Sequence, residues 1–314
     1  MTKQAIIVGS EGQDGCLLFD LLVERGYEVI GVGKNFVRTT QPIHLQSIDI
    51  RNSDAVTNLI ETTKPAEVYY LAAFHYSSEE KFSNLDSRCM LMTSMDIHVH
   101  GLINFLEAIR RTSSRTRIFY AASSLVFGNP SQTPQNEQTP FNPLCAYGIS
   151  KAAGVHCCRF YRNTHGVFTI AGILYNHESY LRPEHFISQK IIRGAKSIQQ
   201  NRQDRLILGD LSVIRDWGYA PDYVDAMHRL LQINKPEDVV IASGEGHTVR
   251  EFVQIAFDVL GLDWKYFVRE DPRILRDRQP VYIGNPQYLK KLTGWKPSIS
   301  FQEMIHKLMT DNSR

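Results

Sequence analysis

The chain has 314 residues, of which 43% are hydrophobic and 22% are charged, as is ordinary for a globular protein. Its 35 Lys and Arg residues nearly balance 33 Asp and Glu residues, so we expect no nucleic-acid-binding surface, which would carry a large basic excess. The sequence has no apolar run of the roughly 18 residues that a membrane span needs, and its N-terminus shows no signal-peptide pattern. These features predict a cytoplasmic protein that binds neither nucleic acid nor membrane.

The cysteine pattern argues against a disulfide framework. The five cysteines are an odd number and form no CxxC pair. We therefore expect reduced thiols and no metal site.

Strand and helix patterns alternate along the first part of the chain. Strands are expected at residues 5–8, 28–32, 67–71, 117–121 and 168–174, with a further strand ending at 48–50. Helices are expected at 17–26, 56–63, 93–110 and 146–164. This alternation predicts an α/β fold, a Rossmann-type doubly wound parallel sheet covered by helices on both faces.

The pattern loosens after residue 175. Residues 176–183 are polar and are expected to form a loop. Further helices are expected at 186–198, 224–234, 249–260 and 301–309, with a short strand at 206–208. We therefore expect a Rossmann domain over 1–175 and a smaller C-terminal α/β substrate domain over 176–314, some segments of which return to the Rossmann core.

A glycine-rich turn follows the first expected strand and opens the first expected helix. Gly9 would allow a tight turn, Gly12 would let the backbone approach a pyrophosphate, and Gly15 would let the helix pack against the strand. The helix N-terminus, with Gln13 and Asp14, would then face the anion. In this strand–turn–helix context the glycines predict a dinucleotide-binding site.

The end of the second strand distinguishes the two nicotinamide cofactors. An acidic residue there would bind a ribose 2′-hydroxyl, but the sequence has Gly33 and Lys34. Lys34 can accept a 2′-phosphate, and Arg38 could add a second positive charge, so the sequence favours NADP(H) over NAD. Asp49, followed by Ile50, is placed to reach the adenine.

A second motif carries acid–base chemistry. Tyr147 and Lys151 are four residues apart, which places both side chains on one face of a helix. A lysine ammonium near the phenol would lower the pKa of the tyrosine and let it exchange a proton near neutral pH. Ser123, at the end of the fifth strand, could hydrogen-bond the same substrate oxygen.

Together, the glycine turn, Ser123 and the Tyr147–Lys151 motif resemble the extended short-chain dehydrogenase/reductase family. The run Leu71, Ala72, Ala73 after the fourth strand matches the family pattern, and the resemblance implies cofactor contacts there and at His177. One departure is His98, which lies where many members carry an asparagine.

Longer motifs resemble the GDP-mannose 4,6-dehydratases and the GDP-4-keto-6-deoxymannose reductases. They span residues 9–15, 174–179, 215–218, 222–224, 246–252 and 294–297, and Arg276 with residues 280–284 also resembles the reductases. The resemblance implies a GDP-linked hexose substrate bound mainly by the C-terminal part. The residues that it implies for substrate binding are Ser124, Leu125, Asn176, Phe186, Ile187, Lys190, Arg215 and Arg276.

Leu125 breaks the dehydratase pattern. A 4,6-dehydratase removes the C5 proton with a carboxylate, and the resemblance places that glutamate at position 125. A leucine cannot transfer a proton, whereas hydride transfer at C4 needs only NADP(H), Ser123, Tyr147 and Lys151. The sequence therefore favours a GDP-4-keto sugar reductase.

Three alternatives stay open. The first is a dehydratase with a relocated acid or base, for which Glu79, Glu80, His75 and His177 are candidates. The others are an epimerase acting through a 4-keto intermediate and a catalytically silent NADP-binding partner. The resemblance also implies a homodimer, paired through the helix after the fourth strand and the helix of Tyr147.

Overall fold

The computed structural model describes residues 2–33, 44–74, 86–271, 273–274 and 280–311. Its largest element is a seven-stranded sheet in the order β10-β6-β5-β4-β1-β2-β3, in which every neighbouring pair is parallel. The strands are β1 (Gln4–Val8), β2 (Glu28–Val32), β3 (His44–Gln46), β4 (Glu67–Tyr70), β5 (Arg117–Ser123), β6 (Thr169–Leu174) and β10 (Val239–Ile241). The strand order reverses between β1 and β4, and open α/β sheets bind ligands at the carboxyl ends of the strands at such a point.

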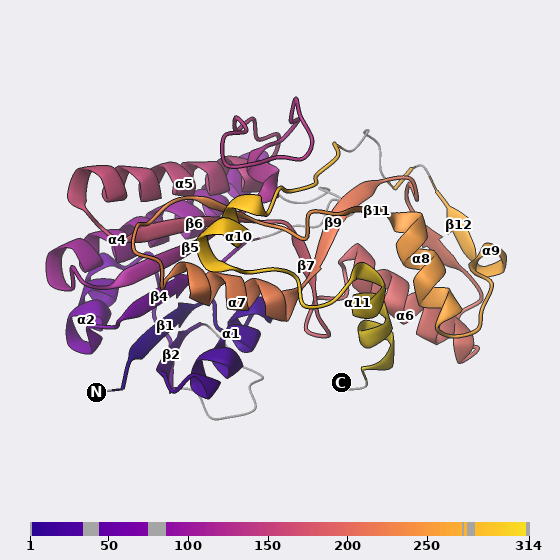
Figure 1. Ribbon diagram of the computed structural model, residues 1–314, viewed down its shortest axis with the longest axis horizontal. Helices are drawn as coiled ribbons and strands as arrows, with labels where there is room; N and C mark the ends of the chain where they lie inside the picture. Colours follow the sequence, from indigo (N-terminus) through magenta and orange to yellow (C-terminus); the bar gives the residue numbers. More distant parts are fainter. Residues whose placement is uncertain (1, 34–43, 75–85, 272, 275–279, 312–314) are drawn as a thin grey trace.

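Helices cover both faces of this sheet (Figure 1). One face packs against α2 (Ser53–Thr63), α4 (Gly101–Thr112) and α5 (Ala146–His165). The other face packs against α1 (Gln13–Glu24), α7 (Ala220–Leu230) and α10 (Gln287–Thr293). The predicted doubly wound α/β fold is thus confirmed.

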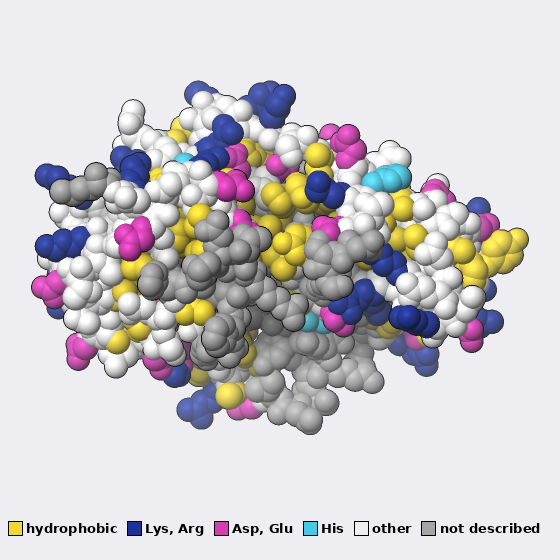
Figure 2. Space-filling view, turned by 90° about the horizontal axis from the view of Figure 1, so that it is seen from below, with side chains coloured by type: hydrophobic (Ala, Val, Ile, Leu, Met, Phe, Trp, Pro, Cys, Tyr) yellow, Lys and Arg dark blue, Asp and Glu magenta, His cyan; other side chains and the backbone are white. Residues whose placement is uncertain are grey.

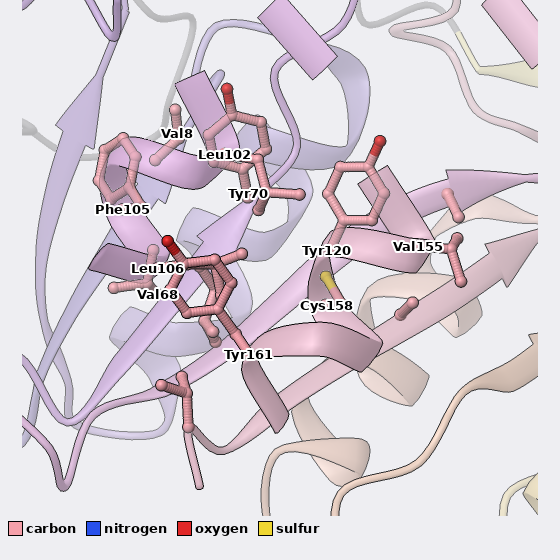
Figure 3. Close-up of a cluster of buried hydrophobic side chains, with 14 of the residues drawn as sticks. Val8, Val68, Tyr70, Leu102, Phe105, Leu106, Tyr120, Val155, Cys158 and Tyr161 are labelled. Atoms are coloured by element: carbon pink, nitrogen blue, oxygen red, sulfur yellow. The ribbon is translucent and has the colours of Figure 1, made fainter. Parts of the chain in front are cut away.

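The central strands are largely apolar because both of their faces are buried. Along β1, Ile6 and Val8 belong to the cluster under α4 and α5, whereas Ala5 and Ile7 belong to the cluster over α1 and α7. Figure 3 shows the first cluster, in which aromatic rings of β4, β5, α4 and α5 gather around the sheet.

A smaller lobe is built from the later part of the chain and has its own core. Its helices α6 (Ile187–Gln199), α8 (Val249–Asp258) and α11 (Phe301–Thr310) pack around Trp217 and Phe252. The short strands β8 (Leu206–Leu208) and β12 (Val268–Glu270) pair beside them, next to α9 (Trp264–Phe267). A three-stranded sheet of β7 (Asn176–Glu178), β9 (Ile214–Tyr219) and β11 (Gly246–Thr248) lies between this lobe and the large sheet (Figure 1).

Several expected elements differ from the structure. Residues 176–178 form β7 rather than a loop, the third strand ends at residue 46 rather than at 48–50, and α7 spans 220–230 rather than 224–234. The expected helix 93–110 consists of α3 (Ser87–Met95), a π-helical turn η1 (Asp96–His100) and α4. The strands β7, β10, β11 and β12 have three residues each, so their sequences carry little periodic signal, and distant partners complete their hydrogen bonds.

The surface fits the nearly balanced charge of the sequence. On the face shown in Figure 2, Lys and Arg side chains are interspersed with Asp and Glu side chains. Within the described ranges, each helix is too short or too polar to cross a membrane.

Candidate active site

The glycine turn lies between β1 and α1, at the point where the strand order reverses. Gly9 has a φ of 88°, and a Cβ there would lie 2.8 Å from the backbone nitrogen of Ala72. A Cβ on Gly15 would lie 2.4 Å from the carbonyl oxygen of Gly9. At Gly12, the residue that precedes α1, a Cβ would meet among the described residues only that same oxygen, at 3.5 Å. Packing therefore requires glycine at positions 9 and 15, whereas position 12 is left open to an approaching group.

The first turn of α1 is joined to β7 and the residue after it. Gln13 Nε2 donates to the carbonyl oxygen of His177 at 3.1 Å, and Ser179 Oγ donates to Gln13 Oε1 at 2.9 Å. His177 donates from Nδ1 to the Tyr175 carbonyl at 2.7 Å and from Nε2 to the Asp14 carboxylate at 2.9 Å. The structure thus brings Gln13, Asp14 and His177 together, as expected of residues around one site. With both ring nitrogens engaged, His177 is poorly suited to shuttle a proton.

The electrostatics of Asp14 follow from this contact. Burial favours the neutral carboxyl, but the nearby charge and hydrogen bond of His177 outweigh it and lower the pKa of Asp14 below its usual value.

The side chains of Tyr147 and Lys151 lie on the same side of α5. Tyr147 is half-buried in the first turn of the helix, and Lys151 is almost fully buried one turn later. Lys151 Nζ lies 5.5 Å from the centroid of the Tyr147 ring and donates to the Ala121 carbonyl at 2.7 Å. Ser123 ends β5, and its Oγ accepts from the backbone nitrogen of Leu125 at 3.3 Å. The tyrosine and the lysine therefore have the proximity that their spacing predicts.

The pKa of Tyr147 differs from the sequence-based expectation. Burial raises the pKa of Tyr147 above its ordinary value, and the charge that lowers it most is Arg182 rather than Lys151. Burial also lowers the pKa of Lys151 to about 7. The reason is that desolvation dominates both groups, while Lys151 donates to a backbone carbonyl. Tyr147 is therefore a protonated phenol, which suits donation to a substrate oxygen.

Arg182 is a residue that the sequence reasoning missed. Its guanidinium lies 3.7 Å from the centroid of the Phe186 ring and 3.5 Å from the Glu178 carboxylate, and it lowers the pKa of both Asp14 and Tyr147. The available signal was its position between two segments already singled out, 176–179 and 186–190.

The residues expected to bind substrate come from four elements. Ser124 and Leu125 lie in the short 3-10 helix η2 (Ser124–Val126), and Asn176 is the first residue of β7. Phe186 precedes α6, whose first turn contains Ile187 and Lys190. The 3-10 helix η2 follows the carboxyl end of β5, and Asn176 and Arg215 lie in β7 and β9 of the three-stranded sheet. That these residues bind a substrate stays a prediction.

Arg215 is held by backbone acceptors. Its Nη1 donates to the carbonyl oxygens of Ile214 and Pro280, each at 2.8 Å, and its guanidinium lies 5.2 Å from the centroid of the Tyr282 ring. Burial lowers the pKa of Arg215 to about 10.

The remaining expected cofactor residues lie along the carboxyl ends of the strands. Leu71, Ala72 and Ala73 directly follow β4, and the Leu71 nitrogen donates to the Val8 carbonyl at 2.8 Å. Asp49 forms a 2.7 Å ion pair with Arg51, and Ile50 packs against the core beneath α4. Lys34, Arg38, His75, Glu79, Glu80 and Arg276 lie outside the described residues. Among the residues that are described, no cluster of three or more His, Cys, Asp or Glu side chains could hold a metal.

This fold and this arrangement of Ser123, Tyr147 and Lys151 define the class of the extended short-chain dehydrogenases/reductases. The family model described as GDP-mannose 4,6 dehydratase matches residues 6–308. The GDP-mannose 4,6 dehydratase 2 of Arabidopsis thaliana is 38% identical over 98% of this chain and 86% of the relative. The chain belongs to the GDP-mannose 4,6-dehydratase family, and the prediction of an enzyme of the short-chain dehydrogenase/reductase class is confirmed.

Solved structures support the same fold. The structure of RMD from Pseudomonas aeruginosa complexed with NADPH superposes with a TM-score of 0.82 at 23% identity, covering 98% of both chains. The dTDP-glucose 4,6-dehydratase from Bacillus anthracis in complex with NAD superposes with a TM-score of 0.83 at 17% identity, covering 98% of this chain and 96% of the other. At these identities the likeness shows the fold alone.

Proposed function

We propose that this protein is an NADP(H)-dependent reductase that transfers a hydride to C4 of a GDP-linked 4-keto hexose. The observation that carries the proposal is Leu125. A 4,6-dehydratase needs an acid or base beside C5, and here the side chain that follows Ser123 and Ser124 is a leucine packed against the hydrophobic core. General acid–base groups typically contribute about 10²–10⁴-fold to a rate, so dehydration would lose that factor.

The cofactor site is proposed at the glycine turn. The open backbone at Gly12, at the N-terminus of α1, fits the approach of a pyrophosphate. A fold shared with a protein complexed with NADPH supports the choice of a nicotinamide dinucleotide, and Lys34 in the sequence supports the 2′-phosphorylated form. Bound there, the reduced nicotinamide would supply the hydride.

Residues of this chain would supply the proton that the C4 oxygen needs. Tyr147 holds a phenolic proton that it can donate to the C4 oxygen as the carbonyl becomes an alcohol. Ser123 would hydrogen-bond the same oxygen. Lys151, with a pKa lowered to about 7, would stabilise the phenolate that remains and could take part in its reprotonation.

A 4,6-dehydratase with a relocated acid or base is the second candidate. It is favoured by the curated relatives, which are named GDP-mannose 4,6-dehydratases and are up to 38% identical. The epimerase is tested by the same assays. The catalytically silent partner is disfavoured because Ser123, Tyr147 and Lys151 are all present.

Two incubations test the proposal. Purified protein is given either GDP-4-keto-6-deoxymannose with NADPH or GDP-mannose with NADP⁺, and the nucleotide sugars are followed by mass spectrometry. We expect a gain of two mass units with NADPH consumption in the first incubation and no change in the second. Loss of 18 mass units from GDP-mannose would show dehydration and would overturn the inference that Leu125 leaves the protein without the acid or base that dehydration needs. An isomer of unchanged mass with an inverted C4, identified by NMR spectroscopy of the recovered nucleotide sugar, would indicate the epimerase.

We also propose a cytoplasmic homodimer. Large apolar side chains are exposed on the helices α3 and α5, which pack against each other: Met92 is 52% exposed, Ile149 42% and Phe160 54%. Burying these side chains against a second copy would remove them from water. Light scattering during size-exclusion chromatography tests the dimer, and a monomeric mass at micromolar concentration would contradict it.

A further inference from the structure

His98 is a fully buried histidine that the proposed chemistry does not use. It lies in the π-helical turn η1, where one extra residue per turn interrupts the helix between α3 and α4. Its ring meets the Tyr147 ring edge to face, with the centroids 5.1 Å apart. A buried polar ring beside the proposed proton donor invites the question of what its two nitrogens do.

The hydrogen bonds determine the tautomer of His98. The backbone N–H of Phe74 donates to Nε2 at 3.0 Å, so Nε2 carries a lone pair. Nδ1 then carries the hydrogen and donates to Ser150 Oγ at 2.7 Å. Ser150 in turn donates to the carbonyl oxygen of Tyr147 at 2.9 Å. A continuous chain of three hydrogen bonds therefore runs from Phe74 to the backbone of Tyr147.

The two ends of this chain belong to different parts of the candidate site. Phe74 directly follows Leu71, Ala72 and Ala73, and the Ala72 backbone lies close enough to Gly9 to exclude a Cβ there. Ser150 lies between Tyr147 and Lys151 on the first turns of α5. His98 thus connects the loop beside the glycine turn with the helix that carries the proton donor.

We propose that His98 is a positioning residue that holds both the loop after β4 and the first turn of α5. Nε2 fixes the loop through Phe74, and Nδ1 fixes the helix through Ser150. The inference rests on the proposed use of the loop for NADP(H) and of Tyr147 for proton transfer.

Substitutions can separate the two functions of the ring. In His98→Gln, the amide oxygen can reach the position of Nε2 and accept from Phe74, but the bond to Ser150 is lost. In His98→Asn, the shorter amide can donate to Ser150 from the position of Nδ1, but the bond to Phe74 is lost. Tyr70→Phe is the matched control, because it removes a buried hydrogen bond to the Ile97 carbonyl in the same turn without touching Phe74 or Ser150.

The readouts are NADPH affinity by fluorescence titration, kcat and the thermal midpoint. Removing one buried hydrogen bond changes an equilibrium by about two- to tenfold. We expect His98→Gln to keep the NADPH affinity within about twofold and to lower kcat up to about tenfold. For His98→Asn we expect the opposite, a weaker NADPH affinity with kcat nearly unchanged. Tyr70→Phe should lower only the thermal midpoint.

The proposal would be overturned if NADPH affinity and kcat both fell in both variants, in proportion to the fall in thermal midpoint. That result would indicate general damage to the core. The proposal and the proposed function can fail separately. If the wild-type protein reduces no GDP-4-keto sugar, NADPH affinity still decides: affinity kept by Gln and weakened by Asn supports the positioning role, and equal affinities refute it.

Discussion

His177 donates from Nε2 to the carboxylate of Asp14 at 2.9 Å, although 163 residues separate the two. Asp14 lies in the first turn of α1, beside the glycine turn, and His177 lies in β7, between the large sheet and the smaller lobe. The His177 ring is also stacked on Tyr223 of α7, with the centroids 4.5 Å apart. The pair therefore joins the proposed cofactor turn to the segments that precede the proposed sugar site.

Breaking this pair should lower stability in a pH-dependent way. The pKa of Asp14 is lowered in the folded protein, so its ionised form contributes stability above the unfolded value of about 3.8 and loses it as pH falls through the folded pKa. We expect Asp14→Asn to cost about 1–3 kcal/mol at pH 7, as for a lost charged hydrogen bond, and less below pH 4. Urea denaturation at pH 7 and pH 3.5 measures this. The exposed Asp54→Asn is the control, and an equal cost at both pH values would contradict the prediction.

Lys151 should stabilise the fold in its neutral form, whereas Asp14 stabilises it in its charged form. Burial lowers the pKa of Lys151 from 10.5 to about 7, so between these values the unfolded chain binds a proton that the folded protein does not. Stability therefore rises with pH across this window, by up to a few kcal/mol. Lys151→Met removes the titration, so the wild type should gain on this variant between pH 7 and pH 9.5 in urea denaturation. Parallel stability curves would show that Lys151 keeps an ordinary pKa.

Tyr147→Phe should abolish the proton donor while leaving the site in place. We expect kcat to fall about 10²–10⁴-fold and NADPH affinity to stay within about twofold. Absorbance at 340 nm with a GDP-4-keto sugar measures the rate. Tyr161→Phe, near the other end of α5, is the control and should retain full activity. Retention of more than a tenth of wild-type kcat by Tyr147→Phe would exclude Tyr147 as the acid.

Two glycines of the turn should have different functions, Gly15 in packing and Gly12 in cofactor binding. A Cβ on Gly15 would lie 2.4 Å from the Gly9 oxygen, so Gly15→Ala should lower the thermal midpoint by several degrees. Gly12→Ala should keep the fold, because the one neighbour its Cβ meets within the described ranges lies at an ordinary 3.5 Å, but it should weaken NADPH binding about tenfold or more by blocking the approach of the pyrophosphate. Calorimetry and fluorescence titration report the two effects. Unchanged NADPH affinity in Gly12→Ala would move the cofactor away from this turn.

Leu125→Glu tests the feature that decides between the two reactions. Restoring a carboxylate beside Ser123 should produce some loss of 18 mass units from GDP-mannose in the presence of NADP⁺. It should also lower stability, because an acid replaces an apolar side chain that packs on the core. Leu125→Gln is the matched control, because glutamine has the shape of glutamate but carries no acid. Equal dehydration by the wild type, Gln and Glu proteins would show that another group moves the C5 proton.

Much of the large sheet could be predicted because its strands are short apolar runs between amphipathic helices. The residues 5–8, 28–32 and 168–174 lie within one residue of β1, β2 and β6. The expectation of a loop at 176–183 was wrong for its first three residues, because β7 forms by pairing with β9, some forty residues later. Such pairing leaves little mark on three consecutive residues.

By itself the sequence determined the class of fold, the glycine turn, the Tyr147–Lys151 spacing and the presence of a leucine at position 125, because each depends on residue type at short range. Only the tertiary structure decided the protonation and the partners of these groups. Burial, which no local pattern records, raised the pKa of Tyr147 and lowered that of Lys151. Likewise, the pairing of Asp14 with His177 and of Phe74 with Ser150 through His98 depends on segments brought together by the shared core.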